Sequence, residues 1–144
     1  MLDNYQYLID ELLSAPKLVR DTIAAHGGEA PDDVRGLIAM LAERDGVMLD
    51  RLTRVKREQF ANLRALPDLS DAQPPAADQD LDALLGTFDT NRGELVSLLM
   101  NLTLKDWEKP AAHETEGETT IADEVETHVD LDEALRARIE ATLG

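Results

Sequence analysis

The sequence contains no cysteine among its 144 residues, so disulfides, thiolate metal ligands and thiol nucleophiles are excluded. Aromatic residues are scarce, at 3% of the chain, so the hydrophobic content of 43% must come mostly from aliphatic side chains. Basic residues are few: 14 Lys and Arg stand against 30 Asp and Glu, which gives a formal net charge of −16. Because this charge repels a phosphate backbone, nucleic acid is not expected as a partner.

Long apolar runs are lacking too. No stretch approaches the length of a membrane span, and the N-terminal residues Met1–Gln6 have neither the basic region nor the apolar core of a signal peptide. We therefore expect a cytoplasmic protein that makes no membrane contact. The length suits one domain, covering residues 1–144, with one sizeable core.

Apolar residues recur at helical spacing in four segments, which predicts an all-α four-helix bundle. The first segment runs from about Leu2 to Ala25 and ends at His26-Gly27-Gly28, where glycine suits a left-handed position. Pro16 interrupts it and is expected to kink or split the helix. The second segment starts around Pro31-Asp32 and carries apolar residues as far as Val55.

The second half of the chain is divided by a linker. Residues Leu66–Gln79 hold three of the six prolines, and this length lets the chain cross the end of a bundle before the next helix. A third helix is predicted over Asp80–Leu102. A short turn follows over Leu102–Pro110, in which Trp107 caps the bundle end, and Ala111–Glu118 is interpreted as a polar loop. No strand-like alternation is evident.

The last helix is predicted over Thr119–Leu143. Thr120 followed three residues later by Asp123 forms a start similar to a capping box. At about 100° per residue, one face gathers apolar residues together with two polar ones: Ile121, Val125, Leu135, Ile139 and Leu143, with His128 and Asp132.

This stretch resembles the last helix of the DinB/YfiT-like four-helix bundles, a family of metalloenzymes and their relatives, which reads roughly T-L-x-E-x-x-x-H-x-x-x-H-D-x-x-H-L-x-Q-I. Thr120, Ile121, Asp132 and Ile139 match that pattern, and the upstream run Asp106–Pro110 matches as well. The resemblance spans the whole chain. It implies up-down-down-up order with a long crossover after the second helix, and the dimers common in such proteins.

The metal ligands of that family are missing here. The resemblance places its two metal-binding histidines at Leu131 and Leu135, a more variable histidine at Thr127, and a second-helix histidine at Met40. Leucine has no lone pair to give, and methionine is a soft, weak donor. We therefore expect no metal and no other cofactor at these positions.

Three polar residues could form a relocated site. Glu124, His128 and Asp132 are spaced four apart, so they share a helix face and could ligate a metal or act as an acid/base pair. The alternative is that a neighbouring carboxylate simply holds His128 at a partly wet seam of the bundle.

The remaining polar features have simpler interpretations. His113 lies among acidic loop residues and is expected to be solvated, whereas His26 is interpreted as a helix-end residue. Gly36 and Gly46 mark either close helix approach or tolerant surface positions. Six of the 14 bases lie between residues 44 and 64, which predicts an anion-binding edge, a subunit contact or a solvated face; they are Arg44, Arg51, Arg54, Lys56, Arg57 and Arg64.

Three functional hypotheses follow. The first is a DinB-like bundle without its metal centre, homodimeric, that acts as a small-molecule-binding or interaction module. The second is an enzyme of the family's thiol-dependent transferase or isomerase type, with a relocated site on Glu124, His128 and Asp132. The third, nucleic-acid binding, is supported only by the basic run.

Overall fold

The computed structural model describes residues 3–144, so the predicted helix start at Leu2 lies outside the described part. Four long helices and one short helix account for most of it, and the strands are short. The helices are α1 (Asp3–Ala25), α2 (Asp32–Arg57), α3 (Leu81–Met100), α4 (Leu104–Trp107) and α5 (Ile121–Leu143); the strands are β1 (Asn62–Leu63), β2 (Pro110–His113) and β3 (Gly117–Thr120).

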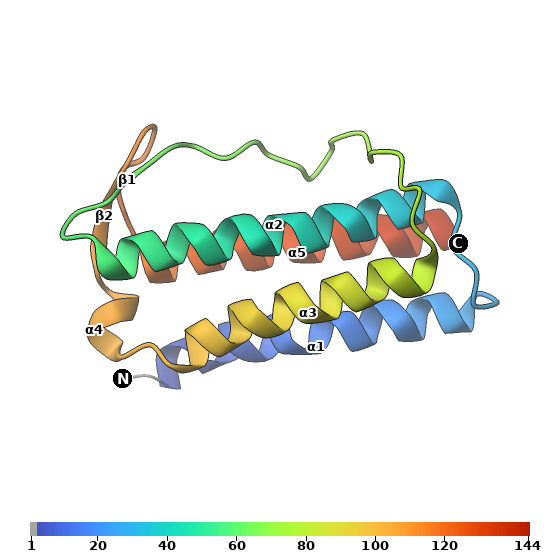
Figure 1. Cartoon of the computed structure of the whole chain (residues 1–144), viewed down its shortest axis with the longest axis horizontal. Coiled ribbons are helices and arrows are strands. Elements are labelled where there is room, and N and C mark those ends of the chain that lie inside the picture. Colours follow the sequence, from blue (N-terminus) through green and yellow to red (C-terminus); the bar gives the residue numbers. More distant parts are fainter. Residues whose placement is uncertain (1–2) are drawn as a thin grey trace.

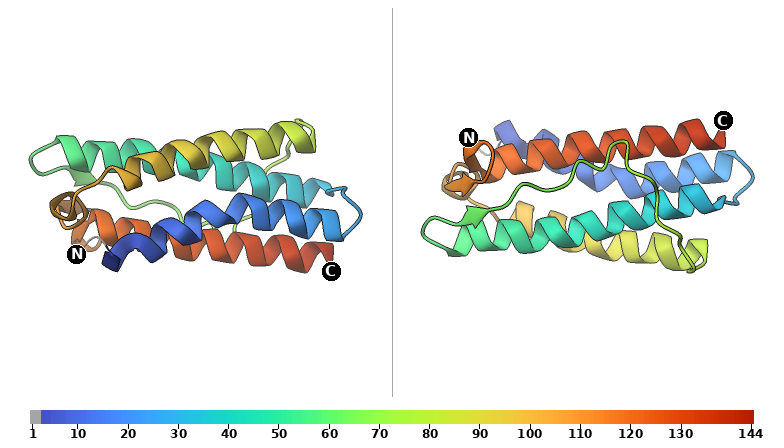
Figure 2. Two further views of the ribbon diagram at one scale, coloured as in Figure 1. Left: turned by 90° about the horizontal axis from the view of Figure 1, so that it is seen from below. Right: turned by 90° about the horizontal axis from the view of Figure 1, so that it is seen from above.

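The four long helices form a bundle in up-down-down-up order. Helices α2 and α3 run in one direction and α1 and α5 in the other (Figure 1). Around the bundle, α3 packs between α1 and α2, while α5 packs on the other sides of the same two helices. Figure 2 shows the connection after α2 running back along the bundle before α3 begins. The predicted fold class and crossover are therefore confirmed.

Helix ends follow the local chemistry of the sequence. The Thr120 side chain accepts a hydrogen bond from Asp123 N, 3.1 Å away, and α5 starts at the next residue. After α1, Gly27 and Gly28 adopt positive φ, and Gly28 N donates to Ile23 O, so the glycine-ended helix is also confirmed. Of the two outcomes expected at Pro16, a split does not occur, because α1 continues through the proline to Ala25.

A small sheet covers the end of the bundle where α4 lies. β2 pairs antiparallel with β3, and β1 pairs parallel with β2. The interpretation of Ala111–Glu118 as a polar loop is thus wrong, because backbone pairing turns it into a hairpin. Trp107 does cap this end: it is buried and stacks on Tyr5, with ring centroids 4.8 Å apart.

The apolar core has two parts separated by a polar layer. One cluster fills the end near the sheet and includes Leu12, Met48 and Leu95; the other fills the opposite half and includes Ala15, Phe88 and Leu135. Along every long helix the change from one cluster to the other falls near the middle. Charged side chains occupy this middle level, and they position the candidate site.

The linker is held against the outside of the bundle. It lies so close to α2 that a Cβ added at Gly36 would be 2.4 Å from Pro75 O and 2.8 Å from Pro74 Cβ. Gly36 therefore marks a close approach, of the linker and not of another helix, whereas a Cβ at Gly46 would meet nothing within 4 Å. In the described part of the chain, no helix is both long and apolar enough to cross a membrane.

Candidate functional site

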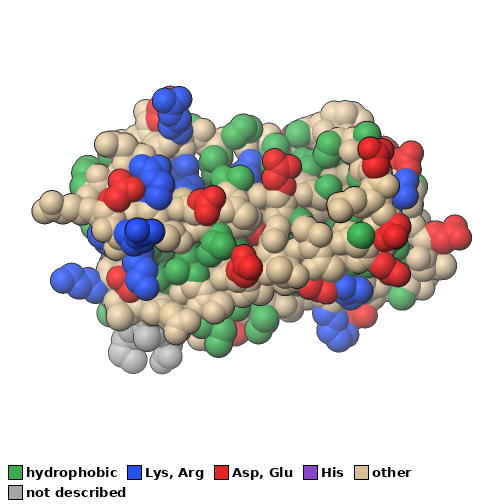
Figure 3. Space-filling view, in the orientation of Figure 1, with side chains coloured by type: hydrophobic (Ala, Val, Ile, Leu, Met, Phe, Trp, Pro, Cys, Tyr) green, Lys and Arg blue, Asp and Glu red, His purple; other side chains and the backbone are tan. Residues whose placement is uncertain are grey.

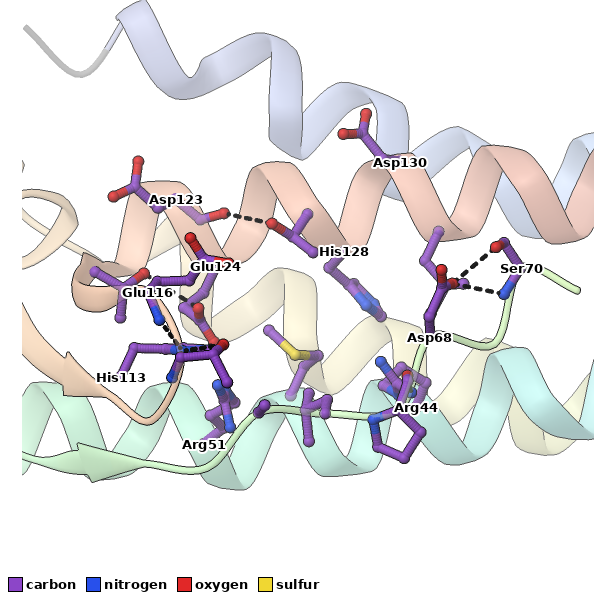
Figure 4. Close-up of a pocket in the computed structure, with 18 of the residues that line it drawn as sticks. Arg44, Arg51, Asp68, Ser70, His113, Glu116, Asp123, Glu124, His128 and Asp130 are labelled. Carbon is purple, nitrogen blue, oxygen red and sulfur yellow. Dashed lines mark hydrogen bonds and ion pairs between the residues drawn. The ribbon is translucent and has the colours of Figure 1, made fainter. Parts of the chain in front are cut away.

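A cavity of about 650 Å³ lies between α2, α5, the linker and the β2–β3 hairpin. Figure 4 shows His128 projecting from α5 into the space between α5 and α2, with Arg44 and Arg51 on α2 and Asp68 on the linker. The cavity is lined by both apolar and polar side chains. The apolar ones are Met48, Ala65, Leu66, Pro67, Leu131 and Ala134.

Arg92 connects all four long helices at the polar middle level. From α3, its Nε donates to Asp45 Oδ2 on α2 at 2.9 Å, and its terminal nitrogens donate to Asp132 Oδ1 on α5 at 2.6 Å and to Leu12 O on α1 at 2.7 Å. The side chains of Arg92, Asp45 and Asp132 are almost wholly buried. Burial disfavours the charged guanidinium, but Asp132 and Asp45 outweigh it and raise the pKa of Arg92, so it stays charged.

The polar layer continues to His128 and to a second arginine. His128 Nε2 lies 2.8 Å from Asp45 Oδ1, while His128 Nδ1 is buried with no hydrogen-bond partner among the described residues. Asp132 Oδ2 accepts from Arg136 Nε at 3.2 Å. Asp45 therefore links the imidazole to the guanidinium of Arg92, and Asp132 lies between two arginines.

A second buried ion pair forms the wall nearest the sheet. Arg51 Nε donates to Glu124 Oε1, and the other oxygen of Glu124 accepts from the Thr119 hydroxyl at 3.1 Å. Arg51 also donates to Arg64 O at 2.7 Å, which ties α2 to the strand-to-linker segment. The carboxylate of Glu124 is thus engaged from both sides.

Arg44 is the cationic group of the cavity that has no carboxylate partner within 4.0 Å in the described part of the chain. It donates to Pro67 O at 2.7 Å and so holds the linker over the cavity. Burial, and then repulsion from Arg51, lower the pKa of Arg44 from its ordinary value. Because the ordinary pKa of an arginine lies far above 7, Arg44 stays cationic in neutral solution.

The three positions that the family resemblance assigns to metal ligands lie in the same apolar half of the core. Met40, Leu131 and Leu135 are buried members of the same hydrophobic cluster, and Leu131 also lines the cavity. The more variable position, Thr127, lies at the cavity wall too.

The structure does not bring Glu124, His128 and Asp132 together as one ligand set. Glu124 contacts Arg51, His128 contacts Asp45, and Asp132 contacts Arg92 and Arg136. Across residues 3–144, no group of three or more His, Asp or Glu side chains is placed to hold a metal ion. The histidine held by a carboxylate is observed, but the carboxylate comes from α2 and not from the histidine's own helix.

The other two histidines have structural contacts. His113 is not simply solvated as predicted, because its Nδ1 accepts from the backbone N–H groups of Thr115 and Glu116, at 3.2 and 3.1 Å, and so shapes the hairpin turn. His26 is a helix-end residue as predicted, with Nδ1 2.8 Å from Thr22 O.

The predicted basic face needs one correction. Arg51 is only 8% exposed and forms an ion pair with Glu124, so it cannot belong to an open positive surface. Arg54, Lys56 and Arg57 remain exposed near the end of α2. Figure 3 shows Lys and Arg gathered mainly at the end of the molecule where α2 meets the sheet.

Arg92 and Asp45 are central to this layer and were not among the predicted site residues. A signal for both exists in the sequence. Arg92 falls at core spacing between Phe88 and Leu95, and Asp45 does so between Leu41 and Met48. A charged residue on a core stripe needs a buried partner, as His128 and Asp132 do on α5, but the spacing does not say which of these residues pair.

The fold is an all-α four-helix bundle similar to that of YfiT. In a comparison with solved structures, the chain is similar to YfiT from Bacillus subtilis, described as a probable metal-dependent hydrolase with an unusual four-helix bundle topology. The TM-score is 0.75 at 17% sequence identity, and the match covers 98% of this chain and 86% of that one. No family model matches the sequence, and no curated protein matches it significantly. At this identity the likeness shows the fold.

Proposed function

We propose that this protein is a DinB/YfiT-like bundle that binds a small molecule in the α2–α5 cavity and has no metal centre at the family's ligand positions. The observation that carries the proposal is the cavity itself. Its volume of about 650 Å³ is typical of small-molecule sites. Apolar side chains such as Met48 and Leu131 line it alongside a few fixed polar groups, the mixture that such sites use for affinity and orientation.

The absence of donors at the family's positions supports binding without a metal. Met40, Leu131 and Leu135 pack among apolar neighbours. The nearby carboxylates of Asp45 and Asp132 both pair with Arg92, and Asp132 also pairs with Arg136, so two guanidinium groups already balance their charges. A divalent cation would have to compete with that guanidinium for both carboxylates.

The alternative is a metal-dependent thiol transferase or isomerase with a relocated site on Glu124, His128 and Asp132. It has less support, because Glu124 pairs with Arg51 whereas Asp132 pairs with Arg92. Metal binding there would require two buried ion pairs to be broken, and each would leave an uncompensated charge.

The proposal is tested by blocking the cavity. Binding of fluorinated fragments is followed by ¹⁹F NMR in the unmodified protein and in Ala134→Trp, since Ala134 lines the cavity. The matched control is Ala137→Trp on the same helix, at an exposed position outside the cavity lining. We expect fragment binding to the unmodified protein and the control, and its loss in Ala134→Trp. Binding that survives in Ala134→Trp would place the ligand elsewhere and contradict the proposal.

We also propose that the protein forms a homodimer through the exposed basic residues near the end of α2. The support is the coexistence of this cluster, Arg54, Lys56 and Arg57, with a strongly acidic remainder of the surface.

A further inference from the structure

The cavity is lined by a cation and an anion that are neighbours but do not form an ion pair. Arg44 reaches from α2 to Pro67 O on the linker, 2.7 Å away, and Asp68 is the next linker residue. No nitrogen of Arg44 lies within 4.0 Å of a carboxylate oxygen in the described part of the chain. Figure 4 shows Arg44, Asp68 and Ser70 at the end of the cavity away from the β2–β3 hairpin.

Both groups keep polar atoms that a ligand can use. Arg44 donates to the linker through Nη2, and its Nε and Nη1 make no hydrogen bond among the described residues. The buried side-chain atoms without a partner in residues 3–144 include none of Arg44, so these two nitrogens are accessible. Asp68 is exposed, and both hydrogen bonds from Ser70 go to its Oδ1, which leaves Oδ2 free.

Both groups are also held in place and charged. Ser70 N and Oγ donate to Asp68 Oδ1 at 2.9 and 2.7 Å; these two bonds, and with a smaller effect the charge of Arg44, lower the pKa of Asp68. Burial and then Arg51 lower the pKa of Arg44, whereas Asp68 raises it. The two charges therefore lie close enough to act on each other, although they are not in contact.

The rest of the lining decides what charge a ligand can carry. Arg44 and Arg51 stand against six carboxylates, which are those of Asp68, Glu116, Glu118, Asp123, Glu124 and Asp130. This excess repels a ligand that is only an anion. A ligand that is only a cation would leave the half-buried Arg44, which already has Arg51 as a like-charged neighbour, without a counter-charge. A zwitterion meets both conditions.

Apolar side chains near the two charges provide space for the rest of the ligand. Met48 lies one turn after Arg44 on α2, Leu66 lies on the linker, and Leu131 and Ala134 line the cavity from α5. The volume of about 650 Å³ has room for a small molecule with an apolar group.

We propose that the cavity binds a free α-amino acid with an apolar side chain, whose carboxylate accepts from the guanidinium of Arg44 and whose ammonium group donates to the carboxylate of Asp68. A guanidinium presents its N–H groups in a planar fork that matches the two oxygens of a carboxylate. The inference rests on the proposed cavity function and adds the chemical class of the ligand.

The test compares three probes that share a fluorophenyl group and differ in charge. p-Fluorophenylalanine carries both charges, p-fluorophenethylamine only the ammonium group, and p-fluorohydrocinnamate only the carboxylate. Each is titrated into the full chain and followed by ¹⁹F NMR. We expect the amino acid to bind about tenfold more tightly than the amine, which lacks the charge-assisted bonds to Arg44. It should bind about fivefold more tightly than the acid, since Asp68 is exposed and its ion pair is weaker.

Two variants should each remove one preference. Arg44→Gln keeps a donor for the linker but loses the charge, so the amino acid and the amine should bind alike. Asp68→Asn keeps an acceptor for Ser70, so the amino acid and the acid should bind alike. A role confined to holding the linker would instead weaken all three probes together.

The matched control is Arg138→Gln. Arg138 also holds the linker, through Leu69 O and Ser70 O at 3.4 and 3.3 Å, but it does not line the cavity. Both preferences should therefore remain in this variant. Their loss in Arg138→Gln would show that they depend on the position of the linker and would overturn the direct roles of Arg44 and Asp68.

The comparison of probes on the unmodified protein needs no variant, so it stays valid if a variant fails to fold. Equal binding of the amine and the amino acid would overturn the role of Arg44, and equal binding of the acid and the amino acid that of Asp68. If fragments bind and Ala134→Trp blocks them, but the amino acid does not bind, the ligand class is overturned and the cavity function stands. Amino-acid binding that survives in Ala134→Trp would place its site elsewhere and overturn the inference.

Discussion

Arg92 is the residue on which the middle of the bundle depends. Its guanidinium donates to the carboxylates of Asp45 and Asp132 and to the backbone of α1, so one side chain makes polar contacts with three other helices. It also lies over the Phe88 ring, 4.9 Å from the centroid. Buried charges are tolerated only when every partner is present, because removal of one leaves the others desolvated and unpaired.

Replacing Arg92 by methionine should therefore lower the free energy of unfolding by about 3–5 kcal/mol, the range for breaking a buried pair by removing one partner. Urea denaturation measures the change. The control is Arg20→Met, which breaks the half-exposed pair with Asp89 and should cost no more than about 1 kcal/mol. A triple change that adds Asp45→Asn and Asp132→Asn should recover part of the loss. Equal effects of the two single changes would contradict the role given to Arg92.

At the scale of elements, the linker completes the cavity. Residues 65–68 and Ser70 supply part of its lining, and Arg44 and Arg138 hold this segment through backbone oxygens of Pro67, Leu69 and Ser70. Farther along, the linker packs against Gly36, where even one added carbon would meet Pro75. The crossover is thus a fixed wall of the site as well as a connection.

Gly36→Ala should displace the linker and destabilise the protein by about 1–3 kcal/mol, as overpacking in tight contacts does. Gly46→Ala, in the same helix but with open space around it, should instead stabilise by up to about 1 kcal/mol, because alanine favours the helix. Thermal denaturation of the two variants gives the comparison. Identical responses would show that the linker is not packed on α2 as described.

The helices also allow a metal site to be built at the positions that the family resemblance assigns to ligands. The triple change Met40→His, Leu131→His and Leu135→His places imidazoles in one buried cluster, and it should create a site for zinc or nickel. The empty variant should be less stable, since each buried apolar side chain contributes about 1.5–3 kcal/mol. Isothermal titration with Zn²⁺, with and without a chelator, measures the gain. If no stoichiometric binding appears in the folded variant, the three positions do not converge.

The sequence predicts the helices better than it predicts their polar contacts. Periodicity and caps locate α5 and the glycine end of α1, because these signals are local. The hairpin over residues 110–120 is missed, because its strands are short and β1 pairs with β2 across about 50 residues of chain. Arg92 is missed for a similar reason: its spacing places it on a core stripe, but nothing local indicates that its partners are Asp45 and Asp132.

At the scale of the molecule, charge is the basis for the proposed dimer. If the exposed bases at the end of α2 meet an acidic face of a second copy, Lys56→Glu with Arg57→Glu should weaken association, and high salt should do the same. Arg51 is not a suitable target, since its change would break a buried pair. Sedimentation velocity at tens of micromolar measures the oligomeric state. Lys17→Glu on α1, which reverses a charge away from this cluster, is the control. A monomer under these conditions would contradict the dimer.

The central claim is that the bundle works without a metal at the family's ligand positions. Elemental analysis of the purified protein tests it most directly. We expect no stoichiometric zinc, nickel or iron, and a thermal unfolding temperature that a chelator does not change, because Met40, Leu131 and Leu135 are apolar and two arginines already pair with the nearby carboxylates. One bound metal per chain, lost in His128→Ala, would contradict the account and favour the relocated-site enzyme.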